Sequence, residues 1–218
     1  METLLVTLPV LILSVVFHEV AHGYAARAQG DPTAAMLGRL TLNPVPHLDP
    51  LGSFVVPGLL ALSGTGVVFG WARPVPVNPR NFREYRRGDI IVSLAGVAVN
   101  LVLAVVFAVL QALVAWVALA APGLGGPLQL LQQMFVYGVF INLILVLFNL
   151  VPIPPLDGSH VLYHLLPPRL GARYREMGRY GMLLVFAFLF LGGFNLLLPP
   201  LRLLSGAAIG FGNLLLGV

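Results

Sequence analysis

A long apolar stretch runs from Ile90 to Ala121 and contains no charged residue. An α-helix needs about 20 apolar residues to cross the hydrocarbon core of a bilayer, so this stretch is long enough for a membrane span. The whole chain shares this character, because 58% of its residues are hydrophobic and only 9% are charged. Soluble domains carry about 25% charged residues. The composition therefore predicts an all-α polytopic membrane protein, integral to a lipid bilayer.

Other apolar stretches raise the expected number of transmembrane helices to about five to six. Spans are expected from about Leu4 to Ala28, from Leu128 to Leu150 and from Tyr180 to Leu198, with a weaker tail that extends to Val218. A shorter segment, 54–69, is interrupted by Pro57-Gly58 and by Gly64-Thr65-Gly66. We expect one membrane-embedded domain over residues 1–218, with accessory helices in 177–218.

The positions of the arginines predict how the chain is oriented in the membrane. The chain has no lysine, and most of its arginines lie in two loops, 73–87 and 169–179. Because arginine-rich loops stay cytoplasmic, both loops and Arg27 are expected on that side. A full crossing by 54–69 would separate the arginines that flank it, so a re-entrant hairpin is favoured, although the sequence leaves a crossing open. The clusters indicate topology, and no nucleic-acid partner is expected.

The segment between the first two apolar stretches is expected to be irregular, with one short strand. Met36 to Pro44 shows some alternation of apolar and polar residues, which suits a membrane-embedded strand. The next residues are broken by prolines and cannot form a helix. His47 and Asp49 lie in this loop. They either cap backbone groups there or support and gate a site beside the first helix.

The first apolar stretch contains the motif Phe17-His18-Glu19-Val20-Ala21-His22-Gly23. Residues four apart share one face of a helix, so His18 and His22 can hold one metal ion from the same side. Glu19 points about 100° away and can reach a water on that ion. This is the spacing of a zinc metallopeptidase site. Ordinary helices also match it by chance, but ionisable groups inside a membrane are functional candidates by default.

The third metal ligand must be a carboxylate or a histidine, because the chain has no cysteine. Asp157 is the first choice. It follows three prolines that break an apolar helix, and non-helical backbone at membrane depth is tolerated where it lines a cavity. Asp49 is the second choice, and the plainer interpretation of Asp157 is a helix N-cap. With His18, His22 and Asp157 as ligands of one Zn²⁺, Glu19 is expected to act as the general base.

Two further polar positions accompany Asp157. Asn149 lies eight residues earlier, at the broken end of the helix, where its amide can bind an oxyanion or the substrate strand. An interhelical hydrogen bond is an equally plain alternative. Asn142 is expected to serve packing. His160 and His164 follow Asp157 on a helix. His160 can support the site, but simple polarity at a helix interface is the favoured interpretation of both histidines.

Three motifs in this order resemble those of the site-2 protease family, the intramembrane zinc metalloproteases of the peptidase M50 type. They are the His18–His22 motif, the small-residue segment Ser93-Leu-Ala-Gly-Val-Ala-Val-Asn100, and Phe148-Asn-Leu-Val-Pro-Ile-Pro-Pro-Leu-Asp-Gly158. The resemblance covers about Leu4 to Leu166 and is that of a minimal member without a PDZ domain. It implies zinc ligation by His18, His22 and Asp157, catalysis by Glu19, and substrate contact by Asn149.

The chain departs from the family at two places. Val97 stands where proline is frequent, and Ser159-His160 follows Asp-Gly where many members have a glycine and an arginine.

The resemblance implies an intramembrane zinc-dependent endopeptidase that cleaves single-pass transmembrane proteins. The alternative is a non-catalytic metal-binding membrane scaffold or transporter. A transporter usually needs polar residues along a path, whereas here they converge on one point. We expect a prokaryotic plasma membrane, with the active site towards the cytoplasmic half. The sequence does not indicate the substrate, the regulator or the oligomeric state.

Overall fold

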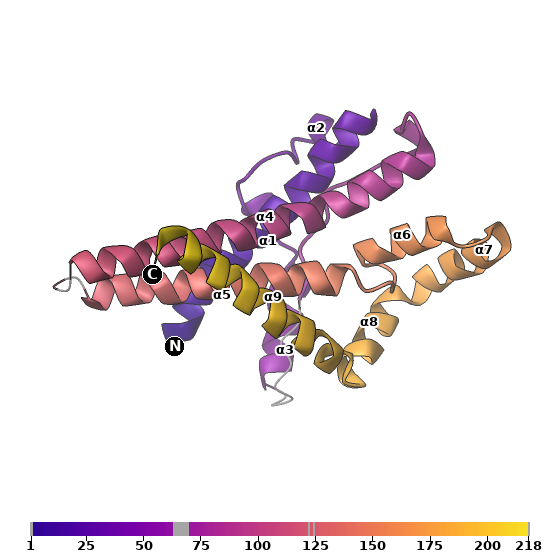
Figure 1. Ribbon diagram of the computed structural model, residues 1–218. Coiled ribbons are helices and arrows are strands. Elements are labelled where there is room, and N and C mark those ends of the chain that lie inside the picture. The colour runs from indigo at the N-terminus through magenta and orange to yellow at the C-terminus, as the bar shows by residue number, and fades with distance from the viewer. Residues whose placement is uncertain (1, 63–69, 122, 124, 218) are drawn as a thin grey trace.

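The computed structural model describes residues 2–62, 70–121, 123 and 125–217, and every regular element within these ranges is a helix. The expectation of an all-α membrane protein is therefore confirmed. Four helices are long and apolar enough to cross a membrane (Figure 1). They are α1 (Glu2–Gln29), α4 (Tyr85–Ala120), α5 (Gly125–Asn149) and α9 (Gly193–Leu216).

Helix α4 is the centre of the bundle, because α1, α5 and α9 all pack against it. Small residues on α4 allow this close approach, and Ala104 and Ala108 are fully buried. They share one apolar core with residues of the three neighbours: Val10 of α1, Val139 and Leu143 of α5, and Leu201 of α9. Small residues at such contacts let transmembrane helices gain dispersion energy where lipid offers no hydrophobic driving force.

Short elements connect α1 to α4. They are α2 (Thr33–Met36), the 3₁₀ turn η1 (Val45–His47), the π-helical turn η2 (Pro50–Val55), α3 (Val56–Leu62) and the 3₁₀ turn η3 (Pro79–Asn81). The strand expected over 36–44 is wrong, since the described residues contain no strand. Side chains satisfy the backbone where a partner strand would be needed. The Thr41 hydroxyl accepts from Asn43 N, and the Arg39 guanidinium donates to Arg73 O at 2.9 Å.

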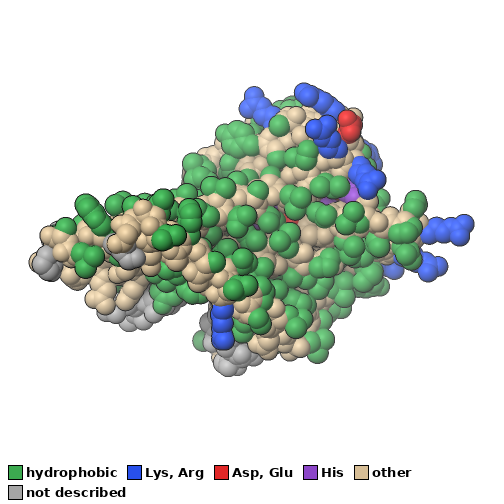
Figure 2. All heavy atoms as spheres, viewed as in Figure 1, with side chains coloured by type: hydrophobic (Ala, Val, Ile, Leu, Met, Phe, Trp, Pro, Cys, Tyr) green, Lys and Arg blue, Asp and Glu red, His purple; other side chains and the backbone are tan. Residues whose placement is uncertain are grey.

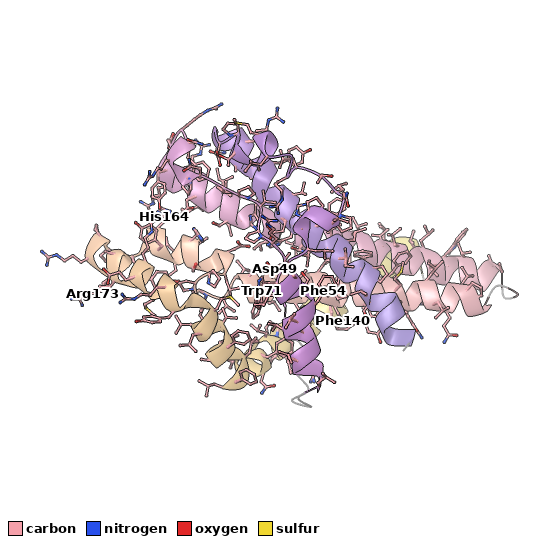
Figure 3. All side chains as sticks on the ribbon, turned by 180° about the vertical axis from the view of Figure 1, so that it is seen from behind. Asp49, Phe54, Trp71, Phe140, His164 and Arg173 are labelled. Atoms are coloured by element: carbon pink, nitrogen blue, oxygen red, sulfur yellow. The ribbon has the colours of Figure 1, made fainter. Side chains whose placement is uncertain are left out.

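The residues before and after the segment expected to form a hairpin lie next to each other and are joined by backbone hydrogen bonds. Trp71 N donates to Gly52 O at 3.1 Å, and Arg73 N donates to His47 O at 2.8 Å. The Trp71 ring covers Gly52, where an added Cβ would come within 2.4 Å of it. The Ser53 hydroxyl donates to Trp71 O at 3.1 Å, in the region where Figure 3 labels Asp49, Phe54 and Trp71. Residues 56–62 of this segment are helical, and the Gly64-Thr65-Gly66 break lies outside the described residues.

The C-terminal third contains four shorter elements before α9. They are α6 (Asp157–Leu165), α7 (Pro168–Glu176), the 3₁₀ turn η5 (Met177–Tyr180) and α8 (Gly181–Phe190). The single span expected from Tyr180 to Leu198 is wrong, because α8 ends at Phe190 and a new helix starts at Gly193. Gly192 has φ +86°, a left-handed conformation that glycine adopts without steric penalty.

The apolar stretch is therefore bent at this glycine pair, and α9 continues through Pro199 and Pro200 instead of ending before them. Helix α8 has 10 residues. It is too short to cross a bilayer, because a transmembrane helix needs about 20 residues. This bend explains why the described residues hold four candidate spans where five to six were expected.

Most of the arginine side chains visible in one view gather at one end of the molecule. In Figure 2 they lie around the C-terminal end of α1, the start of α4 and α7, with one further basic side chain near the lower edge, whereas the opposite tip of α4 and α5 shows no basic side chain in this view. The expected arginine clusters of 73–87 and 169–179 thus face the same end of the bundle in this view.

Candidate metal centre

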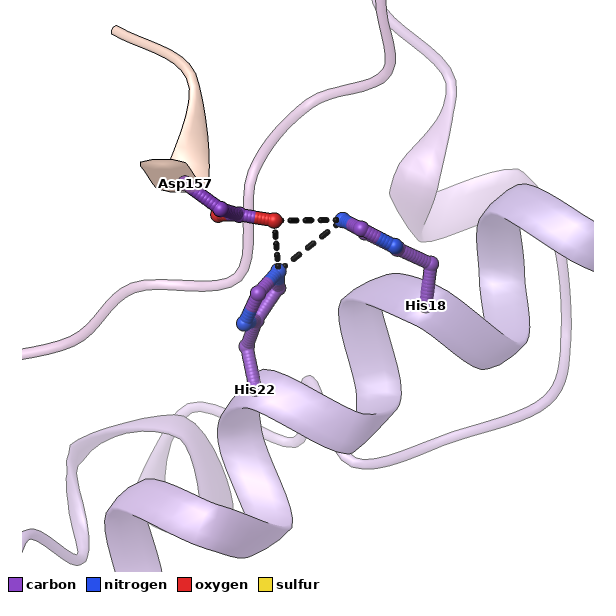
Figure 4. A group of neighbouring side chains, drawn as sticks. All are labelled: His18, His22 and Asp157. Carbon is purple, nitrogen blue, oxygen red and sulfur yellow. Dashed lines mark hydrogen bonds and ion pairs between the residues drawn. The ribbon is translucent and has the colours of Figure 1, made fainter. Parts of the chain in front are cut away.

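Two histidines of α1 and the first residue of α6 converge on one point (Figure 4). The Nε2 atoms of His18 and His22 lie 3.3 and 3.5 Å from Asp157 Oδ2, and the two Nε2 atoms are 3.0 Å apart. Among the described residues, these form the one group of three or more side chains that could hold a metal ion. Segments more than 130 residues apart in the chain therefore bring together the three side chains expected as ligands.

Hydrogen bonds at Nδ1 orient both imidazole rings. His18 Nδ1 lies 2.5 Å from Asn100 Oδ1, and His22 Nδ1 lies 2.7 Å from the carbonyl oxygen of Val92. Both partners are acceptors, so each Nδ1 carries the proton and donates. Each Nε2 then presents its lone pair towards Asp157, which is the tautomer that a metal-binding histidine needs.

A buried polar network fixes the acceptor of His18. Asn100 Nδ2 donates to Asn142 Oδ1 at 2.7 Å, which leaves Asn100 Oδ1 facing His18. Asn142 Nδ2 donates in turn to Ser14 Oγ at 2.8 Å. Ser14, Asn100 and Asn142 have no exposed surface and join α1, α4 and α5. Sequence reasoning assigned Asn142 to packing and did not single out Ser14, although a polar residue inside an apolar span is itself a signal.

The surroundings of Asp157 fit a bound cation. Its Oδ2 is buried and makes no hydrogen bond, and its close polar neighbours are the two imidazole nitrogens. A buried carboxylate oxygen without a hydrogen-bond donor is costly. Two imidazole nitrogens and one carboxylate are the kind of donor set that holds catalytic zinc while leaving a position for water. The N-cap of α6 is Leu156, and no side chain caps the helix. The structure therefore gives Asp157 no capping role.

Two glycines permit the approach of these side chains. A Cβ at Gly96 would lie 2.6 Å from both His18 Cε1 and His22 Nε2, so the two rings rest on the backbone of α4. A Cβ at Gly158 would lie 2.3 Å from Leu150 O, so the start of α6 touches the end of α5. Neither position has room for a side chain in this arrangement.

Glu19 is anchored beside the centre by an extended piece of chain. Its Oε2 accepts a hydrogen bond from Val75 N at 2.8 Å. Val75 is buried against α1, next to Gly23, where an added Cβ would come within 2.9 Å of it. One carboxylate oxygen of Glu19 is thus held in a defined direction next to His18, and the role expected for Glu19 remains a prediction.

Asn149 is the last residue of α5, and its Nδ2 donates to Leu145 O one turn earlier, at 3.0 Å. This contact stays within one helix, so it is neither the interhelical bond considered for Asn149 nor evidence for substrate contact, which remains a prediction. The interhelical role belongs to Asn142 instead.

The loop residues His47 and Asp49 bind nearby backbone. Asp49 Oδ1 accepts from Gly52 N at 2.6 Å and caps η2, and His47 Nε2 donates to Thr41 O at 2.9 Å. Asp49 is not in the three-residue group. The plainer interpretation of these two residues, as capping groups of a loop, therefore matches their contacts.

Comparisons with known proteins agree with this chemistry. The model of peptidase family M50 matches residues 6–193. The chain is 43% identical over 183 residues to a Bacillus subtilis protein named "Putative zinc metalloprotease YwhC", with 83% of this chain and 77% of that protein covered. Two proteins named "Putative zinc metalloprotease Rip2" are also similar. The Mycolicibacterium smegmatis protein is 31% identical over 192 residues, covering 84% and 66%, and the Mycobacterium tuberculosis H37Rv protein is 33% identical over 159 residues, covering 72% and 56%. No solved structure matches the chain.

Proposed function

Because the chain belongs to peptidase family M50 and is a zinc metalloendopeptidase, we propose that it cleaves transmembrane segments of single-pass membrane proteins. One zinc ion per chain is held by His18, His22 and Asp157. The observation that carries the proposal is the depth of the ligands. His18 and His22 lie inside the candidate span Val6–Gln29, so a peptide bond must come to them within the membrane.

The residues around the centre divide the work of hydrolysis. Bound zinc supplies Lewis-acid chemistry, because it makes a water more acidic and polarises the scissile carbonyl. Glu19 takes the proton from the attacking water and gives it to the leaving amine. The bond from Val75 N orients the Glu19 carboxylate for this transfer. His18 and His22 keep their Nδ1 protons and donate them in hydrogen bonds to Asn100 Oδ1 and Val92 O, so neither ring takes part in the proton transfer.

An apolar groove along α1 supports entry of a membrane-embedded substrate. It has a volume of about 510 Å³, and its lining includes Phe17, the residue before His18 in the sequence. Every lining residue is of an apolar type: Leu8, Pro9, Ile12, Leu13, Val16, Phe17, Leu42 and Pro44. A transmembrane helix with an apolar face fits such a surface. Asn149, at the end of α5, contacts the substrate backbone after its amide leaves Leu145 O.

The arginines support a position of the site in the cytoplasmic half of a prokaryotic plasma membrane. Arg27 lies five residues after His22, near the end of α1. Arginine-rich loops stay cytoplasmic, and in the sequence the cluster 73–87 comes between His22 and Asp157 while the cluster 169–179 follows Asp157 closely. The segment 54–69 is then re-entrant, as is supported by the bonds that join residues 47–52 to residues 71–73.

The test is cleavage of a panel of tagged single-pass proteins by the purified enzyme in lipid nanodiscs, with the cut bond identified by mass spectrometry. Wild type should cut within the apolar segment. Glu19→Ala should cut nothing while it keeps one zinc ion per chain, whereas a scaffold or transporter would keep its function in this variant. Cleavage confined to the soluble tails would refute the intramembrane substrate but leave the peptidase intact.

A further inference from the structure

Helix α6, which begins with Asp157, is held in place by α4 and not by the helix that carries the histidines. Among the described residues its extensive contacts are with α4 and α7, and any contact with α1 is slight. The distance from Asp157 to His18 and His22 is therefore set indirectly, by how α1 and α6 each sit on α4. What fixes α6 on α4 controls whether the third ligand reaches the metal.

A buried carboxylate of α4 faces two histidines of α6. Asp89 Oδ2 lies 2.7 Å from His164 Nε2, and Asp89 Oδ1 lies 3.2 Å from His160 Nδ1. The Asp89 and His164 side chains are 7% and 5% exposed, and that of His160 is 46% exposed. Figure 3 shows His164 between the two helices. The hydrogen bond with Asp89 also raises the pKa of His160, so the protonated, positively charged form of this imidazole is favoured beside the carboxylate.

These groups lie in line with the metal ligands on both helices. On α6, Asp157, His160 and His164 are spaced by three and four residues, so they share one face. On α4, the same spacing relates Asp89 to Val92, Gly96 and Asn100. One stripe of α4 thus holds α6 through Asp89, accepts from His22 at Val92, receives both rings at Gly96 and orients His18 through Asn100.

We propose that Asp89, His160 and His164 are positioning residues of the zinc centre, which fix the rotation and register of α6 so that Asp157 meets His18 and His22. Removing a partner from a buried carboxylate is strongly unfavourable. The two Asp89–histidine pairs therefore favour one position of α6 against α4. Because α6 has only nine residues and begins with Asp157, fixing the position of the helix also fixes the position of Asp157. The inference rests on the proposed ligation by His18, His22 and Asp157.

A purely structural ion pair would predict something different, namely lower stability without a specific loss of metal. Asp31 provides the matched control. It is a buried aspartate bound to Thr33, Asn78 and Asn81, and it joins the end of α1 to the 78–81 loop without contacting α6. Asp31→Asn therefore weakens the fold away from the zinc centre.

The experiment measures zinc affinity of the full-length protein in nanodiscs by competition with a chelator, together with the thermal unfolding of the metal-free forms. Asp89→Asn and His160→Ala should bind zinc about tenfold more weakly. This is the low end of the loss of about 10–100-fold that follows removal of a group bonded directly to a metal ligand, because these residues act on Asp157 only through α6. His160→Arg should restore affinity to within about threefold of wild type, because a guanidinium also donates to a carboxylate. Asp31→Asn should lower the unfolding temperature but leave zinc affinity unchanged.

The following results would contradict the positioning role of these residues or the ligand assignment on which it rests. Wild-type affinity in both Asp89→Asn and His160→Ala overturns the proposal, and so does an equal loss of affinity in Asp31→Asn. Should Asp89→Asn fail to fold, His160→Ala decides alone, because that side chain is half exposed. Asp157→Ala separates this idea from its premise, since full zinc affinity in that variant would refute the ligand assignment itself.

Discussion

Replacing Gly96 with alanine should eject zinc, because the new methyl group would occupy the space of both histidine rings. The added Cβ would lie 2.6 Å from His18 Cε1 and from His22 Nε2, whereas nonpolar atoms rest about 3.5 Å apart. Each ring must therefore retreat by roughly 1 Å, although metal–ligand distances tolerate only about 0.2 Å. Retreat also breaks the bonds to Asn100 and Val92, and overpacking itself costs about 1–3 kcal/mol.

We expect Gly96→Ala to lower zinc affinity at least as much as the loss of a partner behind a metal ligand, about 100-fold, and to abolish peptidase activity. The assay is chelator competition on the protein in nanodiscs. Gly206→Ala is the matched control, because α9 leaves nothing within 4 Å of a Cβ there. Gly206→Ala should be neutral or stabilise by up to about 1 kcal/mol. If Gly96→Ala binds zinc as tightly as Gly206→Ala, the packing of the rings on α4 is not as described.

Three other predictions follow from single contacts. Asn142→Leu removes the donor to Ser14 Oγ and leaves Asn100 Nδ2 with only its longer bond to Ser14 O, at 3.4 Å. It should destabilise the protein by about 1 kcal/mol, measured by reversible unfolding in mixed micelles; an unchanged stability would contradict the network. Burial raises the pKa of Asp31, but hydrogen bonds from Thr33, Asn78 and Asn81 outweigh it and hold the pKa below 3.8. The stability that Asp31 contributes is therefore complete above pH 3.8 and lost as the pH falls through the lower folded-state pKa, so the gap in unfolding temperature between wild type and Asp31→Asn should close at low pH and not stay constant. Gly158→Ala would press a methyl group against Leu150 O, backbone that cannot rotate away, and should displace Asp157 enough to lose both zinc and activity, as a zinc titration would reveal; retained zinc binding would show that α6 can move.

Sequence reasoning singled out the three side chains that converge in the structure because their signals are local. The spacing of His18 and His22 fixes a shared helix face, and the prolines before Asp157 mark a helix break at membrane depth. Each signal sits within a dozen residues. Neither depends on how the helices pack, so both can be recognised from the order of the residues alone.

The surroundings of the ligands were missed because they depend on contacts between distant segments. Nothing near Asp89 in the sequence indicates that it faces two histidines more than 70 residues away. The same holds for the carbonyl of Val92, which any residue type would supply. The bend of the apolar stretch at Gly192 also could not be predicted. Hydropathy reports the polarity of the side chains, and it carries no information on whether one glycine adopts a left-handed backbone conformation.

The expected strand over 36–44 failed for a related reason. Alternation indicates which residues share a face, but a strand also needs a partner with unpaired backbone groups. Here the guanidinium of Arg39 occupies the carbonyl oxygens of Arg73 and Pro74 in the neighbouring segment. The sequence shows that an arginine is present at position 39, but it does not show which carbonyl oxygens this arginine binds.

Ligation of one zinc ion by two imidazoles of α1 and the carboxylate of α6, within the membrane, can be observed by X-ray absorption at the zinc edge on the full-length protein in lipid nanodiscs. We expect one zinc per chain with two imidazole ligands and oxygen neighbours at about 2.0–2.2 Å, and the loss of one imidazole in His22→Ala. A centre with no imidazole ligands, or one unchanged in His22→Ala, would contradict it.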